Sequence, residues 1–245
     1  MVAIWPFKKK VDTLEKSGLM QGFTDWHSHI LPGVDDGIPD MPTALQTLAE
    51  YERLGVKRVW LTPHIMEDFP NTTDALRQRF GELKEAYKGS IELNLAAENM
   101  LDSLFMERLE ARDLLPIGKE GNHLLVETSY LNPPMEFDDM IDEIQKAGYY
   151  PVLAHPERYR YMNEADYKDL RRRGVLFQLN LLSVVGGYGE TARGKAEWFL
   201  REGMGELAGS DVHRVSATLR KLAEAPKQKE TLERLLALAS SPKID

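Results

Sequence analysis

Short apolar runs alternate with longer amphipathic stretches along most of the chain. Each run is rich in apolar residues, most contain β-branched or aromatic residues, and each ends in a polar residue, which is typical of buried strands. The runs that predict strands are Phe23–His29, Val56–His64, Ile91–Glu98, His123–Glu127, Tyr150–His155, Val175–Asn180 and Glu206–Asp211.

The stretches between these runs have the spacing of apolar residues that predicts helices. Asp40 is suited to cap the first of them, and Thr72 or Thr73 the second. A glycine follows most of them, at the position where a left-handed residue commonly ends a helix. The predicted helices are about Asp40–Leu54, Thr72–Lys88, Leu101–Arg112, Glu136–Ala147, Glu164–Arg173, Thr191–Arg201 and Ala217–Ser240.

Strand and helix alternate about seven times, which indicates an α/β protein with a parallel sheet. Seven units fit a distorted (β/α)7 TIM-like barrel, and a doubly wound open sheet is the alternative. The stretch Val11–Leu19 predicts an extra N-terminal helix outside the repeat. We therefore expect an N-terminal extension over residues 1–20 and a single barrel domain over residues 21–245.

Composition narrows the possible functions. The net charge of −8 argues against a general nucleic-acid binder, because such proteins present a basic surface. The chain has no cysteine, so a thiolate nucleophile and a disulfide framework are both excluded. Lys8–Lys10 follow the first apolar residues, whereas a signal peptide has its positive charges before the apolar stretch. No apolar run is long enough to span a membrane. These features predict a cytoplasmic protein that is not a membrane protein.

Polar residues with metal-binding side chains stand at the ends of six of the seven predicted strands. The strands of a barrel end on the same face, where active sites lie, so residues far apart in sequence are expected to meet there. His27 and His29 are two positions apart and should point the same way, as should Asp211 and His213. The other candidates at strand ends are His64, Glu98, Glu127 and His155. His123 begins a strand and is expected on the opposite face.

A cluster of imidazoles and carboxylates without thiolates suits divalent metals such as Mn, Zn, Fe, Co or Mg. The set is too large for one four-coordinate ion, so we expect two or three ions. Neighbouring ions stabilise the attacking and leaving oxygens of a displacement and activate water near neutral pH. This chemistry would supply the nucleophile that a phosphatase without cysteine needs.

Three neighbouring segments have alternative interpretations. Gly33–Gly37 is either a plain turn or the source of a further carboxylate ligand. Arg158 forms either a surface ion pair or a bidentate phosphate contact. Gly186–Gly189, which includes Tyr188, is either an ordinary loop or a backbone anion site before a helix.

The segment Asp25–Gly37 resembles the opening motif of the polymerase and histidinol phosphatase (PHP) superfamily. It is most similar to bacterial manganese-dependent protein-tyrosine phosphatases linked to capsule and exopolysaccharide synthesis. The later motifs occur in the same order, and the resemblance covers about residues 20–215. They are Thr62–His64, Ala97–Glu98, Val126–Glu127, Ala154–Tyr159 and Ser210–His213.

The resemblance implies a PHP-type barrel with three divalent ions, for which manganese is expected. It also implies that Arg158 binds the substrate phosphate and acts in catalysis, and that the substrate is a phosphotyrosine protein such as a bacterial tyrosine autokinase. The implied ligand sets are His27, His29, Glu98 and Asp211 for one ion, Glu98, Glu127 and His155 for the second, and Asp36, His64 and His213 for the third.

One position departs from the family. Thr218 stands where well-known members carry a second phosphate-binding arginine, and Arg214 and Arg220 are nearby. Arg214 and Tyr188 are therefore further substrate-binding candidates, while Tyr159, Tyr188 and Phe69 are candidate walls of the site. Two alternative functions are a phosphoesterase for a small phosphomonoester such as histidinol phosphate, and an inactive regulatory or binding protein of polysaccharide export. The sequence does not predict the oligomeric state.

Overall fold

A computed structural model describes residues 10–241 and 244 of the chain. Its strands are all parallel to their neighbours and belong to two sheets, with the orders β1-β2-β4 and β3-β5-β6-β7-β8-β9. The strands are β1 (Thr24–Ser28), β2 (Arg58–Leu61), β3 (His64–Ile65), β4 (Glu92–Leu95), β5 (Glu98–Met100), β6 (His123–Glu127), β7 (Tyr150–Ala154), β8 (Leu176–Asn180) and β9 (Leu207–Gly209).

The two sheets continue into each other and curl into a distorted, barrel-like structure. Backbone hydrogen bonds from Ala96 to Leu61 and from Glu98 to Pro63 bridge the gap on one side. On the other side, the amide of Asp211 donates to His27 and that of His29 donates to Val212. The predicted barrel class is confirmed. Two of the seven predicted strands are interrupted, so Val56–His64 becomes β2 and β3, and Ile91–Glu98 becomes β4 and β5.

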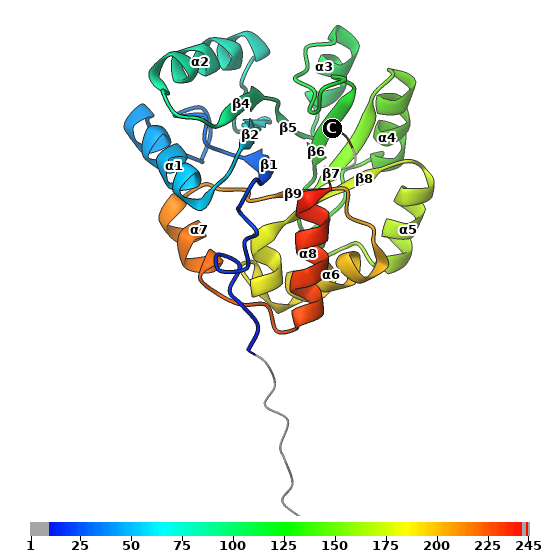
Figure 1. The fold of residues 1–245 in the computed structure, drawn as a ribbon. Coiled ribbons are helices and arrows are strands. Elements are labelled where there is room, and N and C mark those ends of the chain that lie inside the picture. The colour runs from blue at the N-terminus through cyan, green and yellow to red at the C-terminus, as the bar shows by residue number, and fades with distance from the viewer. Residues whose placement is uncertain (1–9, 242–243, 245) are drawn as a thin grey trace, which may run out of the picture.

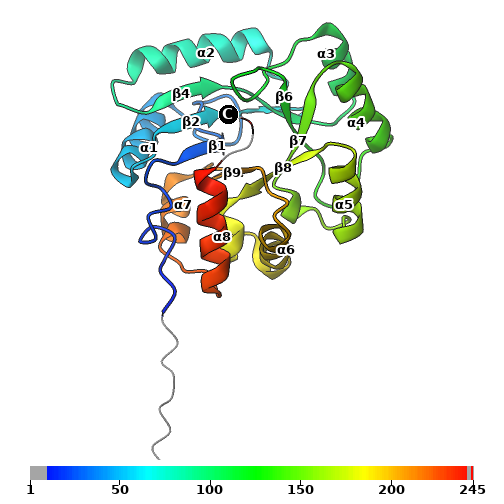
Figure 2. The same ribbon diagram turned by 45° about the vertical axis from the view of Figure 1, so that its right-hand side comes forward.

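Helices surround the strands on the outside (Figures 1 and 2). Asp40 caps α1 by accepting a hydrogen bond from the Thr43 amide, and Gly55 ends it with a left-handed φ of 93°. The helices are α1 (Met41–Leu54), α2 (Thr73–Ala86), α3 (Phe105–Ala111), α4 (Phe137–Lys146), α5 (Glu164–Arg172), α6 (Gly189–Glu202), α7 (Val215–Leu222) and α8 (Lys229–Ser240), with short 3₁₀ helices η1 (Pro156–Arg158) and η2 (Leu181–Val185). No helix in the described part of the chain is long and apolar enough to cross a membrane.

The prediction of one helix over Ala217–Ser240 is wrong, because α7 and α8 are separate helices. The chain between them contains Pro226, which lacks a backbone N–H and restricts the residue before it. The break matters for the site, because it leaves α7 as a short helix directly after the ligand candidates Asp211 and His213.

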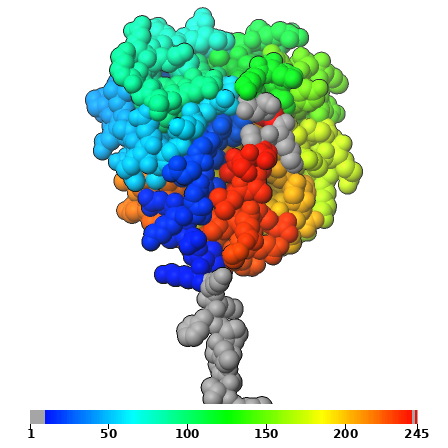
Figure 3. Space-filling model, viewed as in Figure 1, coloured from blue at the N-terminus to red at the C-terminus, as the bar shows by residue number. Residues whose placement is uncertain are grey.

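The predicted N-terminal helix over Val11–Leu19 is also wrong, because residues 14–22 form turns. The amides of Leu14 and Glu15 donate to Glu224 and Leu222 at the end of α7, instead of forming helical hydrogen bonds. Leu14 is nevertheless fully buried in the main hydrophobic cluster. This segment lies on the surface alongside the C-terminal helices (Figure 3).

Successive side chains along a strand point to opposite sides of the sheet, and they belong to two separate apolar layers. Leu124 and Val126 of β6 belong to the large cluster between strands and helices, whereas Leu125 belongs to a smaller cluster contributed largely by the strands. Trp26 stacks on Trp60 in this smaller cluster, with ring centroids 5.8 Å apart. The inner space is therefore filled by side chains, and the polar residues gather where the strands end.

Candidate functional site

Nine of the residues singled out in the sequence come together on one face of the barrel, at or just beyond the ends of β1, β2, β4, β6, β7 and β9. Glu98, at the start of β5, lies at the centre of the group. Its carboxylate oxygens are 3.1 Å from His27, 3.2 Å from His29, 3.2 Å from His64 and 2.8 Å from His155. The remaining members are Asp36, Glu127, Asp211 and His213.

His27 and His29 face each other from the end of β1. Their Nε2 atoms are 3.1 Å apart, and Asp211 Oδ1 lies 3.6 Å from the first and 3.4 Å from the second. The register between β1 and β2 shifts between Asp25 and Ser28, so an irregularity in the strand lies just before the pair. One set of possible metal-ligand atoms therefore converges here, from the two imidazoles, Glu98 and Asp211.

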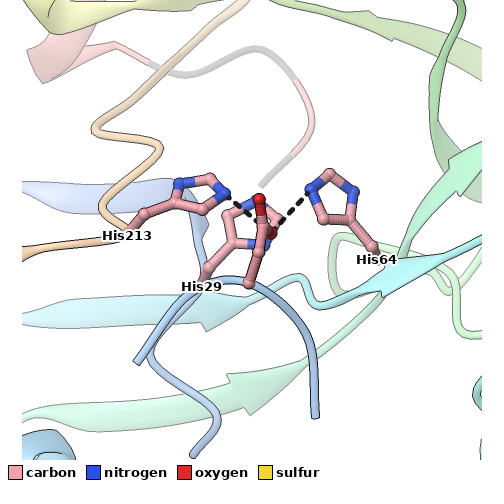
Figure 4. Close-up of side chains that lie close together, drawn as sticks. His29, His64 and His213 are labelled. Atoms are coloured by element: carbon pink, nitrogen blue, oxygen red, sulfur yellow. Dashed lines mark ion pairs between the residues drawn. The ribbon is translucent and has the colours of Figure 1, made fainter. Parts of the chain in front are cut away.

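A second set lies nearer the surface and contains His29, Asp36, His64 and His213, whose ligand atoms lie within 4.8 Å of one another. Asp36 Oδ1 is 3.6 Å from His64 Nε2 and 3.3 Å from His213 Nε2. Figure 4 shows the rings of His29, His64 and His213 gathered around a common space. The Asp36 side chain is 58% exposed, so this set is open to solvent.

The third set surrounds Glu127, at the end of β6. Glu127 Oε1 lies 2.9 Å from His64 Nδ1, and Oε2 lies 3.8 Å from His155 Nε2. Both Glu127 Oε1 and His64 Nδ1 are buried without a hydrogen-bond partner, although they are close together. Buried polar atoms without a hydrogen bond call for another partner, and an imidazole nitrogen and a carboxylate oxygen are both suitable ligands of a metal ion.

Two of the nine residues have strained backbones. Asp211 has a φ of 54° and His155 a φ of 32°, both in the left-handed region that residues other than glycine rarely adopt. Strain of this kind costs roughly 1–3 kcal/mol per residue and concentrates at functional sites. Here it turns both side chains toward the cluster at the ends of β7 and β9.

Further polar residues, which the sequence analysis did not single out, orient the histidines. Asp35 Oδ2 accepts from His29 Nδ1 at 2.8 Å, and Gln178 Oε1 lies 2.7 Å from His27 Nδ1. Asp35 was visible in the Gly33–Gly37 segment beside Asp36, and Gln178 is a polar residue between the apolar Phe177 and Leu179 of β8. An imidazole held through one nitrogen presents the other to a ligand in a fixed direction.

A buried network supports the same region from behind. The Tyr51 hydroxyl donates to Asp25 Oδ2, and the amide and hydroxyl of Ser210 both donate to the Asp25 carboxylate. Burial raises the pKa of Asp25 to about 6, although the hydrogen bonds from Ser210 act in the opposite direction. The network joins α1 to β1, which carries His27, and to the chain after β9, which carries Asp211.

The charges in the cluster are strongly coupled. Burial alone raises the pKa of Glu98, but the imidazoles of His27, His64 and His155 outweigh it and hold that pKa well below its usual value. Burial likewise disfavours charge on His27, yet Glu98 and Asp211 raise its pKa to about 9. The negative charges of Glu98 and Asp211 therefore attract protons or metal cations to this site.

Arg158 occupies the edge of the cluster in a defined position. Its Nη1 donates to Asp211 Oδ2 at 2.7 Å, so its pairing partner is a residue of the site. Its guanidinium carbon lies 4.2 Å from the Tyr130 ring centroid and 4.3 Å from that of Tyr188, so two aromatic rings contact it. Sequence reasoning missed Tyr130, which follows β6 in a segment without a recognisable motif.

The three residues predicted to form walls of the site lie in different environments. Tyr188 lines the cavity and its hydroxyl lies 3.3 Å from Asp211 Oδ2. Phe69 stacks near His64, with ring centroids 6.1 Å apart. Tyr159 is fully buried, and its hydroxyl donates to the Ala154 carbonyl, so its prediction as an accessible wall is wrong. His123 lies at the other end of β6, against Tyr150, as its position in the sequence predicts.

A cavity of about 660 Å³ opens beside the cluster. Asp36, Asp211, His213 and Arg158 line one part of it, and Arg214 lines it on the side of α7. The cavity is large enough for an aromatic side chain and part of a peptide, because pockets for drug-sized molecules have comparable volumes.

Comparison with known proteins gives consistent results. The family model for capsular polysaccharide synthesis, CpsB/CapC, matches residues 23–235. The putative tyrosine-protein phosphatase CapC of Staphylococcus aureus is 26% identical over 198 residues, which cover 78% of this chain and 77% of the relative. The tyrosine-protein phosphatase YwqE of Bacillus subtilis (strain 168) is 27% identical over 197 residues, with the same shares of both chains covered.

A solved structure is also similar. It comes from a study of YwqE from Bacillus subtilis and CpsB from Streptococcus pneumoniae, described as unique metal-dependent tyrosine phosphatases. It superimposes with a TM-score of 0.71 at 23% sequence identity, and the match covers 91% of this chain and 96% of the other. At this identity the superposition shows that the two chains share a fold.

Proposed function

Because the chain belongs to the CpsB/CapC capsular polysaccharide synthesis family, we propose that it is a metal-dependent phosphatase that hydrolyses phosphotyrosine in proteins. The observation that carries this proposal is the position of Glu98 among four imidazoles, with Glu127 and Asp211 beside them. The relatives named as tyrosine-protein phosphatases support the choice of substrate.

The residues fit divalent metal ions. The donors are imidazole nitrogens and carboxylate oxygens, a mixture that suits Mn, Fe, Zn or Co. His64 Nδ1 and Glu127 Oε1 are buried without a hydrogen bond, and cations bound at the cluster would complete their contacts. We propose three manganese ions, whose ligands are His27, His29, Glu98 and Asp211 for one, Glu98, Glu127 and His155 for the second, and Asp36, His64 and His213 for the third.

Ions held in this way supply Lewis acidity toward the phosphoryl oxygens and activate water as the nucleophile. The chain's own residues bind and orient the substrate. Arg158 has guanidinium N–H groups besides the one bonded to Asp211, and a planar fork of donors suits phosphate oxygens. The rings of Tyr130 and Tyr188 fix the plane of that fork before the substrate arrives.

The phosphotyrosine assignment also suits the chemistry of the leaving group. A phenol has a pKa near 10, far below that of an alkyl alcohol, so its departure needs little assistance from a proton donor. The cavity beside the cluster has room for the phenyl ring and is lined by Tyr188. We infer that the physiological substrate is a phosphoprotein of capsule synthesis, such as a tyrosine autokinase.

The test compares substrates on one metal-loaded preparation. A phosphotyrosine peptide, the matching phosphoserine peptide and histidinol phosphate are assayed with added manganese. We expect the phosphotyrosine peptide to have the highest kcat/KM. Preference for histidinol phosphate would instead favour the small-molecule function, and no turnover of any of them would favour a binding protein without catalytic activity.

Replacing Arg158 by lysine is expected to lower kcat/KM for a phosphotyrosine peptide by about 100-fold, an effect typical of losing a positioned charge-stabilising donor. Lysine keeps the positive charge but lacks the planar fork and stacks poorly between two rings. Steady-state kinetics measure the loss, and thermal melting checks that the fold is intact.

The aromatic contacts on Arg158 provide a matched pair of variants. Tyr130→Phe keeps the ring and should retain most of the activity, whereas Tyr130→Leu removes the ring and should lower kcat/KM. Equal activity of the two variants would show that Tyr130 does not orient Arg158.

A further inference from the structure

The cavity beside the cluster extends along one face of α7. Arg214, Ala217, Thr218 and Lys221 line it from one row along the helix, because positions three, four and seven residues apart share a helix face, and Glu224 lines it just beyond the helix end. Arg220, next to this row, lines the cavity as well. Ala217 and Thr218 in the middle are small, so the row has two charged ends with an open stretch between them.

The charge of this face is opposite to that of the whole chain. The protein carries a net charge of −8, yet three of the residues that α7 and its N-cap contribute to the cavity are cations. Lys221 is paired with Glu224 at 3.1 Å. Arg214 and Arg220 are exposed, and within the described residues neither side chain forms a hydrogen bond or an ion pair.

The position of Arg214 is unfavourable for the helix itself. It is the N-cap of α7, makes no side-chain cap hydrogen bond and is followed by a first turn without acidic residues. Cations are disfavoured near a helix N-terminus, where the helix dipole is positive, and a capping side chain is missing as well. A residue that breaks local preferences without a compensating contact is expected at a functional position.

We propose that Arg214 and Arg220 bind a second negative group on the substrate, which lies two to four residues from the phosphotyrosine. This inference rests on the proposed function, because the phosphate at the metal cluster fixes where the peptide begins. Arg214 follows His213 of the cluster directly, and from Arg214 to Arg220 the helix rises by about 9 Å. An extended peptide covers that distance in about three residues. The second group is a carboxylate or another phosphate, since guanidinium groups bind both.

The experiment measures a preference between matched peptides. Three phosphotyrosine peptides differ only at the third residue from the phosphotyrosine, which is glutamine, glutamate or a non-hydrolysable phosphonate analogue of phosphotyrosine. We expect kcat/KM to be about fivefold higher for each acidic peptide than for the glutamine peptide, mainly through KM, because exposed ion pairs contribute modestly. The glutamate and phosphonate arms show which group is preferred.

Variants then locate the preference. Arg220→Gln should reduce the ratio of acidic to neutral peptide toward one, and the double variant with Arg214→Gln should remove the preference. Arg77→Gln is the matched control, because Arg77 is an exposed arginine on α2, which does not line the cavity. The ratio should also fall as the salt concentration rises and screens the exposed charges.

The outcomes separate this inference from the proposed function. Turnover of all three peptides at the same kcat/KM overturns the inference and leaves the phosphatase function standing. The inference is also overturned if the control variant Arg77→Gln lowers the ratio of acidic to neutral peptide as much as Arg220→Gln does. No turnover of any phosphotyrosine peptide by the metal-loaded protein overturns both.

Discussion

Replacing Glu98 by glutamine is expected to lower kcat/KM for a phosphotyrosine peptide by about a thousandfold or more. The carboxylate lies within 3.2 Å of four imidazoles, so a single change alters most of the cluster. Glutamine has nearly the same size, but it carries no charge and offers one acceptor oxygen instead of two. Losing several kcal/mol of transition-state stabilisation corresponds to a factor of this order.

Kinetics on the purified variant, together with metal analysis, test this expectation. Glu85→Gln is the matched control, because Glu85 is an exposed residue of α2. The control should keep full activity and the metal content of the parent protein. Activity of Glu98→Gln close to that of the parent would show that the cluster is not the catalytic centre.

Removal of divalent metal is expected to abolish activity and to lower the melting temperature by roughly 10 °C. The cluster gathers several carboxylates that are mostly buried, and a bound cation compensates their charge. A ligand present at 1,000 times its Kd stabilises the folded state by about 4 kcal/mol. In a domain of this size, each kcal/mol shifts the melting temperature by about 2–4 °C.

Thermal melts with chelator, and again after manganese is restored, measure this shift. The shift should become smaller as the pH falls, because imidazoles bind metal only when deprotonated and protons then compete with the ion. It should also be smaller in Glu98→Gln. Full activity after chelation, with metal analysis showing that none remains, would contradict the proposed chemistry.

The positions of the clustered residues could be predicted from the sequence because they depend on strand ends. Glu98, Glu127 and His155 each stand at the boundary of an apolar run, and the parallel arrangement brings those boundaries to one edge. Exact helix and strand limits do not affect this argument. The interruption of two strands therefore left the predicted cluster unchanged.

Other features depend on contacts that a sequence pattern does not contain. Tyr130 reaches Arg158 from a segment with no regular structure, and Gln178 reaches His27 across 151 positions. The N-terminal segment has the apolar spacing of a helix, but its backbone donors pair with the end of α7. In each of these cases a long-range partner decides the outcome, and local propensity does not.

The order of the cluster along the chain affects how the protein acquires activity during synthesis. His27 is made long before Asp211 and His213, because Asp211 follows it by 184 positions. Because chains are made from the N-terminus onward, the residues at the end of β1 must wait until β9 and the segment after it have been made. A product truncated before Asp211 therefore lacks part of the centre, and hydrolytic capacity begins only after His213 has been added.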